Sequence, residues 1–254
     1  MKRRYTLMAG LAGALVLPAA AARAADIPPA VLSAARCATH AATEAEAANA
    51  MRIIGSQDTA IRTLFGARDL VIVNAGTSRG VAVNQQFFIR THDTFRSRKP
   101  LEARPVDTAG WLRIVAANEN TSIAQVEYAC GGIMTGDYLE PYLEPTLPAD
   151  LSKADTSGTL DFAMPEAVRV LFGERERWTG ATGDFMVVDA GVGRGAEPGV
   201  RYAIFRDVGL SGVPLTPVGE AIVVRADANT AVVRVTQSRD VIQRGDLLIP
   251  RKAR

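Results

Sequence analysis

The sequence contains one pattern twice, and this duplication constrains the fold more than any other feature. An apolar run followed by a Gly-x-x-x-Gly corner occurs at Gly76 and Gly80 and again at Gly191 and Gly195. Later positions repeat with a separation of 109 residues (219 minus 110 for the first pair), namely Gly110 and Gly219, Thr121 and Thr230, Gly136-Asp137 and Gly245-Asp246, and Pro141 and Pro250. Because the matches span whole modules, we expect two copies of one small domain.

Each copy consists of short apolar runs rich in β-branched residues, separated by Gly, Asn, Asp and Pro, and this pattern is typical of β-strands. In the first copy we predict strands at 52–54, 61–65, 70–74, 86–90, 110–116, 121–128 and 138–141. The second copy repeats the order at 159–164, 168–172, 185–189, 201–206, 219–225, 230–236 and 247–250. The fold class is therefore mainly β.

The repeated polar positions are explained by turn chemistry. We expect the corner glycines to supply the positive φ that a chain reversal requires. The segments 117–120 and 226–229 predict hairpins, since Asn and Asp tolerate left-handed conformations. Gly136-Asp137 and Gly245-Asp246 then turn the chain into a closing strand. Two small β-barrels follow, because closure removes the open edges of a short sheet.

The first 24 residues resemble a signal peptide. Lys2, Arg3 and Arg4 precede an apolar run from Leu7 to Ala22, and Ala22-Arg23-Ala24 places small residues at the cleavage-determining positions. An uncleaved membrane anchor is the alternative, although the run contains a proline and is short for a spanning helix. The predicted localisation is the periplasm, with a peripheral position on the outer membrane left open.

Removing this leader changes the charge of the chain. The full sequence has 29 basic and 27 acidic residues, and four of the basic ones lie in the leader. The mature chain then has 25 basic residues against 27 acidic ones, a net charge of −2. A nucleic-acid partner is not expected, because it would require a strongly basic domain. No segment after the leader is apolar enough to predict a membrane span.

We expect five segments along the chain: a signal peptide at 1–24, an N-terminal helix at 25–50, a first barrel module at 51–142, a linker at 143–157 and a second module at 158–254. The helix is predicted from a run rich in Ala and Glu without internal Gly or Pro. The linker is rich in Pro, Ser and Asp. It leaves the barrels free to move relative to each other unless they share an interface.

The chain contains two cysteines, Cys37 and Cys130, both in the exported part. An oxidising compartment would allow them to form a disulfide that ties the N-terminal helix to the end of the first module. The alternative is two buried thiols, since separation in sequence does not show that two residues meet.

Catalytic, metal and cofactor sites are weakly indicated, and we predict none of them. His40 and His92 are the two histidines, and neither has a flanking motif, so both are interpreted as solvated or packing residues. The corner at 191–195 lacks the lysine and the following helix of a phosphate loop. An exported hydrolase that uses paired carboxylates stays open as a second alternative function.

The largest difference between the copies is a longer, basic hairpin between Ile89 and Gly110. A charged loop on a rigid barrel is a natural place for binding, and its partner would be anionic. The alternative is a solvated hairpin. The candidate binding residues are Arg90, Arg96, Arg98, Lys99 and Arg104.

The repeated order of strand, Gly-x-x-x-Gly corner, aromatic strand, charged hairpin, Asn/Asp turn and Gly-Asp before a final Pro resembles known envelope modules. It is similar to the tandem β-barrels that follow LysM domains in proteobacterial envelope proteins, and to the C-terminal domain of flagellar assembly protein T. No LysM sequence is visible. The resemblance implies a non-enzymatic envelope protein with a structural or interaction role and a protein or cell-wall partner. A periplasmic glycan or small-ligand binding protein is the first alternative.

Overall fold

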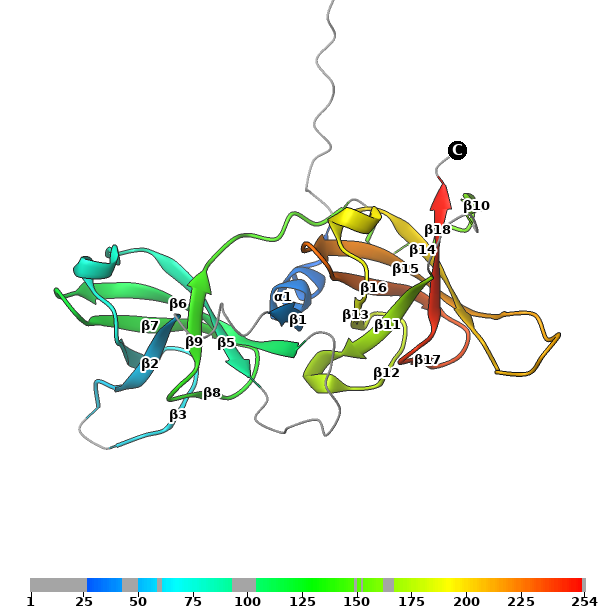
Figure 1. The fold of residues 1–254 in the computed structure, drawn as a ribbon. Helices are drawn as coiled ribbons and strands as arrows, with labels where there is room; N and C mark the ends of the chain where they lie inside the picture. The colour runs from blue at the N-terminus through cyan, green and yellow to red at the C-terminus, as the bar shows by residue number, and fades with distance from the viewer. Residues whose placement is uncertain are drawn as a thin grey trace, which may run out of the picture.

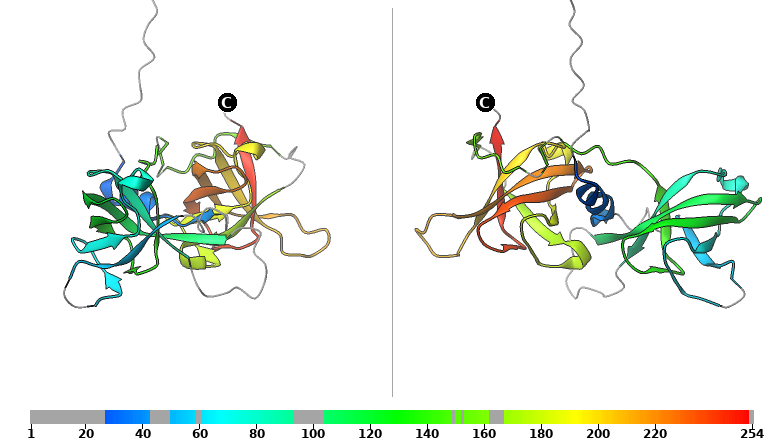
Figure 2. Two further views of the ribbon diagram at one scale, coloured as in Figure 1. Left: turned by 60° about the vertical axis from the view of Figure 1, so that its left-hand side comes forward. Right: turned by 180° about the vertical axis from the view of Figure 1, so that it is seen from behind.

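The computed structural model describes residues 27–42, 50–58, 61–92, 104–148, 150–151, 153–161 and 167–252. These residues form two closed six-strand antiparallel β-barrels with one short helix between them (Figure 1). The mainly β prediction is confirmed. The views show the two barrels side by side (Figure 2), and the helix packs against the second barrel through Val31, Ala34 and Ala35.

The first barrel closes through the strand order β6-β5-β9-β2-β4-β7, with β7 pairing back to β6. A short pair, β3–β8, covers one end. The strands are β2 (Met51–Ser56), β3 (Leu64–Phe65), β4 (Leu70–Val73), β5 (Gln86–His92), β6 (Arg104–Ala117), β7 (Ser122–Ala129), β8 (Ile133–Met134) and β9 (Tyr138–Pro141). Alternate side chains fill the interior, where Ile53, Ile89, Leu112 and Ile114 are fully buried.

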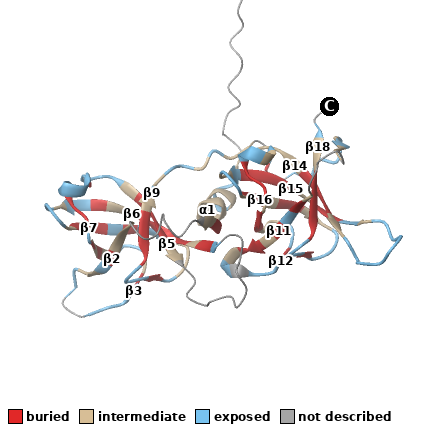
Figure 3. Ribbon diagram, in the orientation of Figure 1, coloured by how far each residue is buried: buried red, intermediate tan, exposed pale blue. Residues whose placement is uncertain are grey.

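The second barrel has the same topology, β18-β11-β13-β16-β15-β14 closed by β18–β14, with β12–β17 at one end. Its strands are β11 (Val168–Gly173), β12 (Thr179–Gly180), β13 (Phe185–Val188), β14 (Arg201–Arg206), β15 (Thr216–Ala226), β16 (Ala231–Ser238), β17 (Ile242–Gln243) and β18 (Leu247–Lys252), and β10 (Thr159–Leu160) extends the sheet beside β18. Buried residues run along the strands of both barrels (Figure 3).

The corner glycines act differently from the expectation. Gly80 and Gly195 have φ values of 78° and 76°, as a chain reversal requires, but Gly76 and Gly191 have negative φ. A Cβ at Gly76 would lie 2.1 Å from the backbone oxygen of Asn118. The corner is docked on the hairpin turn between β6 and β7, so the first glycine is required by close approach of two backbones.

The corner and the hairpin turn are thus two halves of one contact. In the first barrel the amide of Thr77 donates to the oxygen of Asn118 at 2.8 Å, and in the second barrel the amide of Val192 donates to the oxygen of Asp227 at 3.0 Å. Both the Gly-x-x-x-Gly corner and the Asn/Asp turn are repeated in the sequence because each barrel makes the same contact between them.

We predict that Gly76→Ala lowers the free energy of unfolding by about 3 kcal/mol, because overpacking against fixed backbone has no flexible side chain to absorb it. The matched control is Gly55→Ala in β2, where an added Cβ meets no atom within 4 Å. Urea unfolding of both variants checks the prediction. An equal, small loss in the two variants would show that the corner is not docked as described.

The N-terminal segment forms a shorter helix than expected. Helix α1 (Pro29–Cys37) begins after Pro28 and ends well before Ala50, and β1 (His40–Ala42) then pairs with β6 of the first barrel. Residues 43–49 of the predicted helix lie outside the described residues. The alanine-rich composition favours helix, but three backbone pairings with β6 favour strand at His40–Ala42 and override this local preference.

The disulfide is confirmed: Cys37 at the end of α1 is bonded to Cys130, which follows β7, with a Cα–Cα distance of 5.7 Å. Helix α1 is therefore attached to the first barrel covalently and through β1. Its apolar side, with Val31, Ala34 and Ala35, packs instead on the outer face of the second barrel.

The barrels consequently share an interface and are not connected by the linker alone. The outer face of the second barrel buries Phe172, Phe185, Val187, Ile222, Val224 and Val232, together with Ala38 after α1 and Leu151 of the linker. The amide of Arg175 in the 3₁₀ turn Glu174–Glu176 also donates to Asp107 Oδ1 of β6 at 3.2 Å. Apolar burial of this kind opposes free movement of one barrel against the other.

Candidate functional site

A cavity of about 360 Å³ lies where the two barrels and the N-terminal segment meet. We call it the interbarrel pocket. Its lining includes residues of α1, β1 and the segment between them (Arg36, Ala38, His40), of the first barrel (Phe88, Arg90, Glu140), of the linker (Leu143 to Leu147) and of the second barrel (Pro198, Val224 to Asp227, Val232). The volume falls within the range of small-molecule sites.

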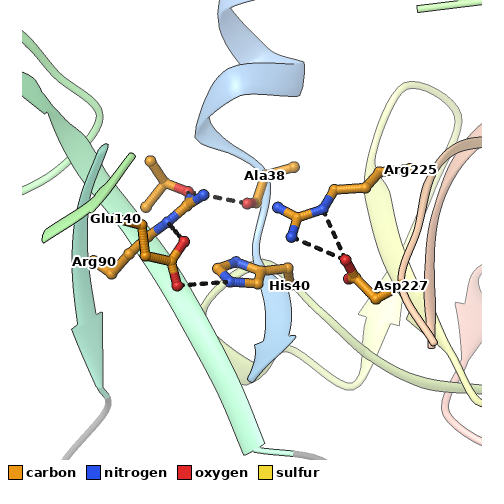
Figure 4. Close-up of polar contacts among 7 residues, drawn as sticks. Ala38, His40, Arg90, Glu140, Arg225 and Asp227 are labelled. Carbon is orange, nitrogen blue, oxygen red and sulfur yellow. Dashed lines mark hydrogen bonds and ion pairs between the residues drawn. The ribbon is translucent and has the colours of Figure 1, made fainter. Parts of the chain in front are cut away.

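One wall of the pocket contains a buried network of charged and polar groups (Figure 4). The guanidinium of Arg90, 3% exposed, donates from Nε to Glu140 Oε2 at 2.9 Å and from Nη1 to the hydroxyl of Thr108. That hydroxyl donates in turn to the backbone oxygen of Ala38 at 3.2 Å. The network therefore joins β5, β6 and β9 to the segment between α1 and β1.

His40 lies between this network and the second barrel. Its Nε2 faces Glu140 Oε1 at 3.8 Å, and the ring is 3% exposed. On the other side, Arg225 and Asp227 at the end of β15 form an ion pair, with Arg225 Nη2 3.0 Å from Asp227 Oδ1 (Figure 4). The imidazole is thus held between charged residues of both barrels.

These surroundings shift the pKa values of His40 and Glu140. Burial, together with the nearby charges of Arg90 and Arg225, lowers the pKa of His40 even though Glu140 acts in the opposite direction. Burial would raise the pKa of Glu140, but its contact with His40 and the charge of Arg90 outweigh this and lower that pKa to about 2. At neutral pH we therefore treat His40 as neutral and Glu140 as ionised.

Two buried polar atoms on residues that line the pocket have no hydrogen-bond partner within the described part of the chain. They are His40 Nδ1 and Asp227 Oδ2. A buried polar atom without a partner costs free energy, so it is normally paired. Both atoms belong to residues that line one cavity, which makes the pocket the candidate ligand site.

Two charged residues of the lining, Arg36 and Glu144, contact Tyr142 and Trp111, which are not among the lining residues. Arg36 Nε donates to Glu144 Oε1 at 3.0 Å, and the hydroxyl of Tyr142 donates to Glu144 Oε2 at 2.7 Å. Burial and this hydrogen bond raise the pKa of Tyr142 to about 12. The guanidinium of Arg36 lies 5.5 Å from the ring centroid of Trp111, which fixes α1 against the first barrel.

The structure separates the five basic residues predicted from the hairpin. Arg90, predicted both as the end of a strand and as a binding residue of the hairpin, lies within β5, which continues to His92, and is buried and paired with Glu140. Arg104 is exposed at the first position of β6. Arg96, Arg98 and Lys99 lie outside the described residues, so binding by the basic hairpin stays a prediction.

Sequence reasoning missed His40, Glu140, Arg225 and Asp227 as members of one site. A signal was present in the repeat: the second module has Phe205 and Ile249 at the positions that match Arg90 and Glu140. A charged pair on strands where the other copy is apolar indicates a role beyond the common fold. His40 gave no such signal, since no residue of the second module corresponds to it.

Among the described residues there is no group of three or more His, Cys, Asp or Glu side chains that could hold a metal ion. Within the same residues no helix has the length and apolar character needed to cross a membrane. Comparison with known proteins gives no matching family model and no matching curated protein. The likeness to LysM-associated and flagellar modules therefore stays a prediction.

The shifted pKa values predict that acid weakens the fold. The unfolded chain protonates His40 near pH 6.5, whereas the folded chain does so at lower pH, so stability falls as pH drops below 6.5. Glu140 contributes stability that is present above its unfolded pKa and is lost as pH falls towards 2. Urea unfolding at pH 7.5 and 5.5 should show lower stability at pH 5.5, and His40→Phe should reduce that difference. A His92→Phe control should keep it, and the reverse pattern would assign the titration to His92.

Proposed function

We propose that the protein is a non-enzymatic binding protein of the cell envelope, exported to the periplasm, which holds its ligand in the interbarrel pocket. The observation that carries this proposal is the pair of unpartnered buried atoms, His40 Nδ1 and Asp227 Oδ2, on two residues that line a cavity of about 360 Å³. The lining combines apolar walls with a few placed polar groups, which is the usual composition of a ligand site.

Export is supported by two features. The sequence begins with a basic segment and an apolar run that resemble a signal peptide. The Cys37–Cys130 disulfide is of the kind that persists in oxidising compartments. The same bond holds α1 against the first barrel and so helps to build one side of the pocket.

A binding role is favoured over the hydrolase alternative by the lining itself. Candidate nucleophiles are few. Both cysteines form the disulfide, and Thr146 is the one hydroxyl residue among the described residues that line the pocket. His40 faces Glu140 through Nε2, but no nucleophile from the described residues is hydrogen-bonded to its Nδ1. A nucleophile within hydrogen-bond reach of a base is the usual sign of covalent hydrolysis.

A thermal-shift screen with a library of small polar and apolar compounds tests the proposal. A compound at ten times its Kd should stabilise the folded protein by about 1.4 kcal/mol and raise the melting temperature by roughly 3 °C. Thr146→Trp, which places an indole on an exposed lining position, should abolish the shift. Thr216→Trp, at an exposed position outside the pocket, is the matched control and should leave it unchanged. Shifts that survive Thr146→Trp would place binding elsewhere and contradict the proposal.

A further inference from the structure

The two unpartnered atoms belong to residues that line the pocket, and both atoms are hydrogen-bond acceptors. His40 Nε2 faces the ionised carboxylate of Glu140, which can only accept, so we assign the imidazole proton to Nε2 and leave a lone pair on Nδ1. Asp227 already accepts from Arg225 through Oδ1, and its Oδ2 is buried and unpaired. A ligand that satisfies both atoms must therefore present hydrogen-bond donors.

The charges around the pocket disfavour a cationic donor. Each carboxylate on the lining is already paired with an arginine: Glu140 with Arg90, Asp227 with Arg225, and Glu144 with Arg36. Arg90 and Arg225 both act against a proton on His40, and they would act in the same way against an ammonium group beside it. An anion would meet the unpaired oxygen of Asp227. The donors should belong to an uncharged group such as an amide.

The walls of the pocket favour aliphatic side chains over sugar rings. They include Leu143, Pro145, Leu147, Pro198, Val224 and Val232. Phe88 is the single aromatic residue among the described lining residues, and its ring is occupied by the protein itself. Arg90 lies 4.4 Å from its centroid and Tyr142 packs at 4.5 Å. Phe88 is 6% exposed, so its ring offers little surface for a sugar to stack on.

Resting on the function proposed above, we propose that the interbarrel pocket binds a short, uncharged peptide segment with aliphatic side chains. Its backbone N–H groups donate to His40 Nδ1 and Asp227 Oδ2, and its side chains pack on the proline, leucine and valine wall. Both acceptors would then be satisfied without adding charge to a site whose charges are already balanced.

Nuclear magnetic resonance titration of the purified protein with N-acetyl-leucyl-leucine amide tests this inference. The imidazole nitrogen signals of His40 report directly on Nδ1. We expect the Nδ1 signal to move on titration. An analogue with every amide nitrogen methylated should bind at least tenfold more weakly, because a hydrogen bond to a charged acceptor typically contributes about a tenfold gain in affinity. This comparison uses the wild-type protein, so it does not depend on the folding of a variant.

Asp227→Asn provides a second arm. Asn occupies the matching position 118 of the first module, so the turn accepts it, and binding of the leucyl peptide should weaken at least tenfold. Equal binding of the peptide and its methylated analogue would overturn the inference while leaving the pocket as a ligand site. Binding of N-acetylglucosamine in place of the peptide would overturn the inference that the ligand is a peptide, but not the assignment of the pocket as a ligand site. If no compound of the wider screen bound in the pocket, the proposed function would fail as well.

Discussion

Cys37→Ala is expected to lower the free energy of unfolding by roughly 4 kcal/mol, since in the chain-entropy model a disulfide that closes a loop of this length restricts the unfolded chain by about that amount. The bond joins residues that are 93 positions apart. The loss has a structural consequence too, because α1 would be attached to the first barrel through β1 and side-chain contacts alone. We therefore expect the interbarrel pocket to open as well.

Urea unfolding under non-reducing conditions measures this effect. The double variant Cys37→Ala/Cys130→Ala should lose the same amount, which separates loss of the bond from the effect of an unpaired thiol. Reduction of the wild-type protein should reproduce the loss. A change below about 1 kcal/mol in all three cases would show that the bridge contributes little to the fold.

The second large effect is expected at Glu140. Glu140→Ala leaves the guanidinium of Arg90, which is 3% exposed, without its carboxylate partner. Removing one member of a buried ion pair typically costs about 3–5 kcal/mol, because an uncompensated charge stays buried. We expect a loss in that range together with local disorder of the pocket wall, measured by urea unfolding and by amide hydrogen exchange at β5 and β9.

Two controls make the Glu140 result specific. Glu127→Ala removes the partner of Arg113 from an exposed pair and should cost less than about 1 kcal/mol. The double variant Arg90→Met/Glu140→Leu replaces both charges by apolar groups and should recover most of the lost stability. If the double variant were as unstable as Glu140→Ala, the cost would come from lost packing and not from an unpaired charge.

The parts of the fold that sequence predicted well are those determined locally. Nearly every main strand was placed, since β-branched runs bounded by turn residues are visible within a few positions. The Gly-Asp turns were also explained: Asp137 Oδ2 accepts the amide of Met134 at 2.8 Å, and Asp246 Oδ2 accepts that of Gln243 at 2.7 Å. Repetition strengthened both predictions, because two copies showed the same spacing.

The parts that sequence did not predict depend on contacts between distant segments. The corner at Gly76 contacts a turn more than forty positions away, so the residues next to Gly76 in the sequence do not indicate its close approach to Asn118. The position of α1 depends on the outer face of the second barrel, which the alternation of strand residues does not distinguish from a solvated face. For the same reason the pocket, assembled from α1, β1, both barrels and the linker, had no motif of its own.

The location of a bound compound tests the central claim most directly. For the best-stabilising compound of the thermal screen, nuclear Overhauser contacts to the protein should be measured in solution. We expect contacts to the methyl groups of Leu147, Val224 and Val232 and to the ring protons of His40. Contacts confined to other surfaces, with none to these four residues, would contradict the assignment of the interbarrel pocket as the binding site.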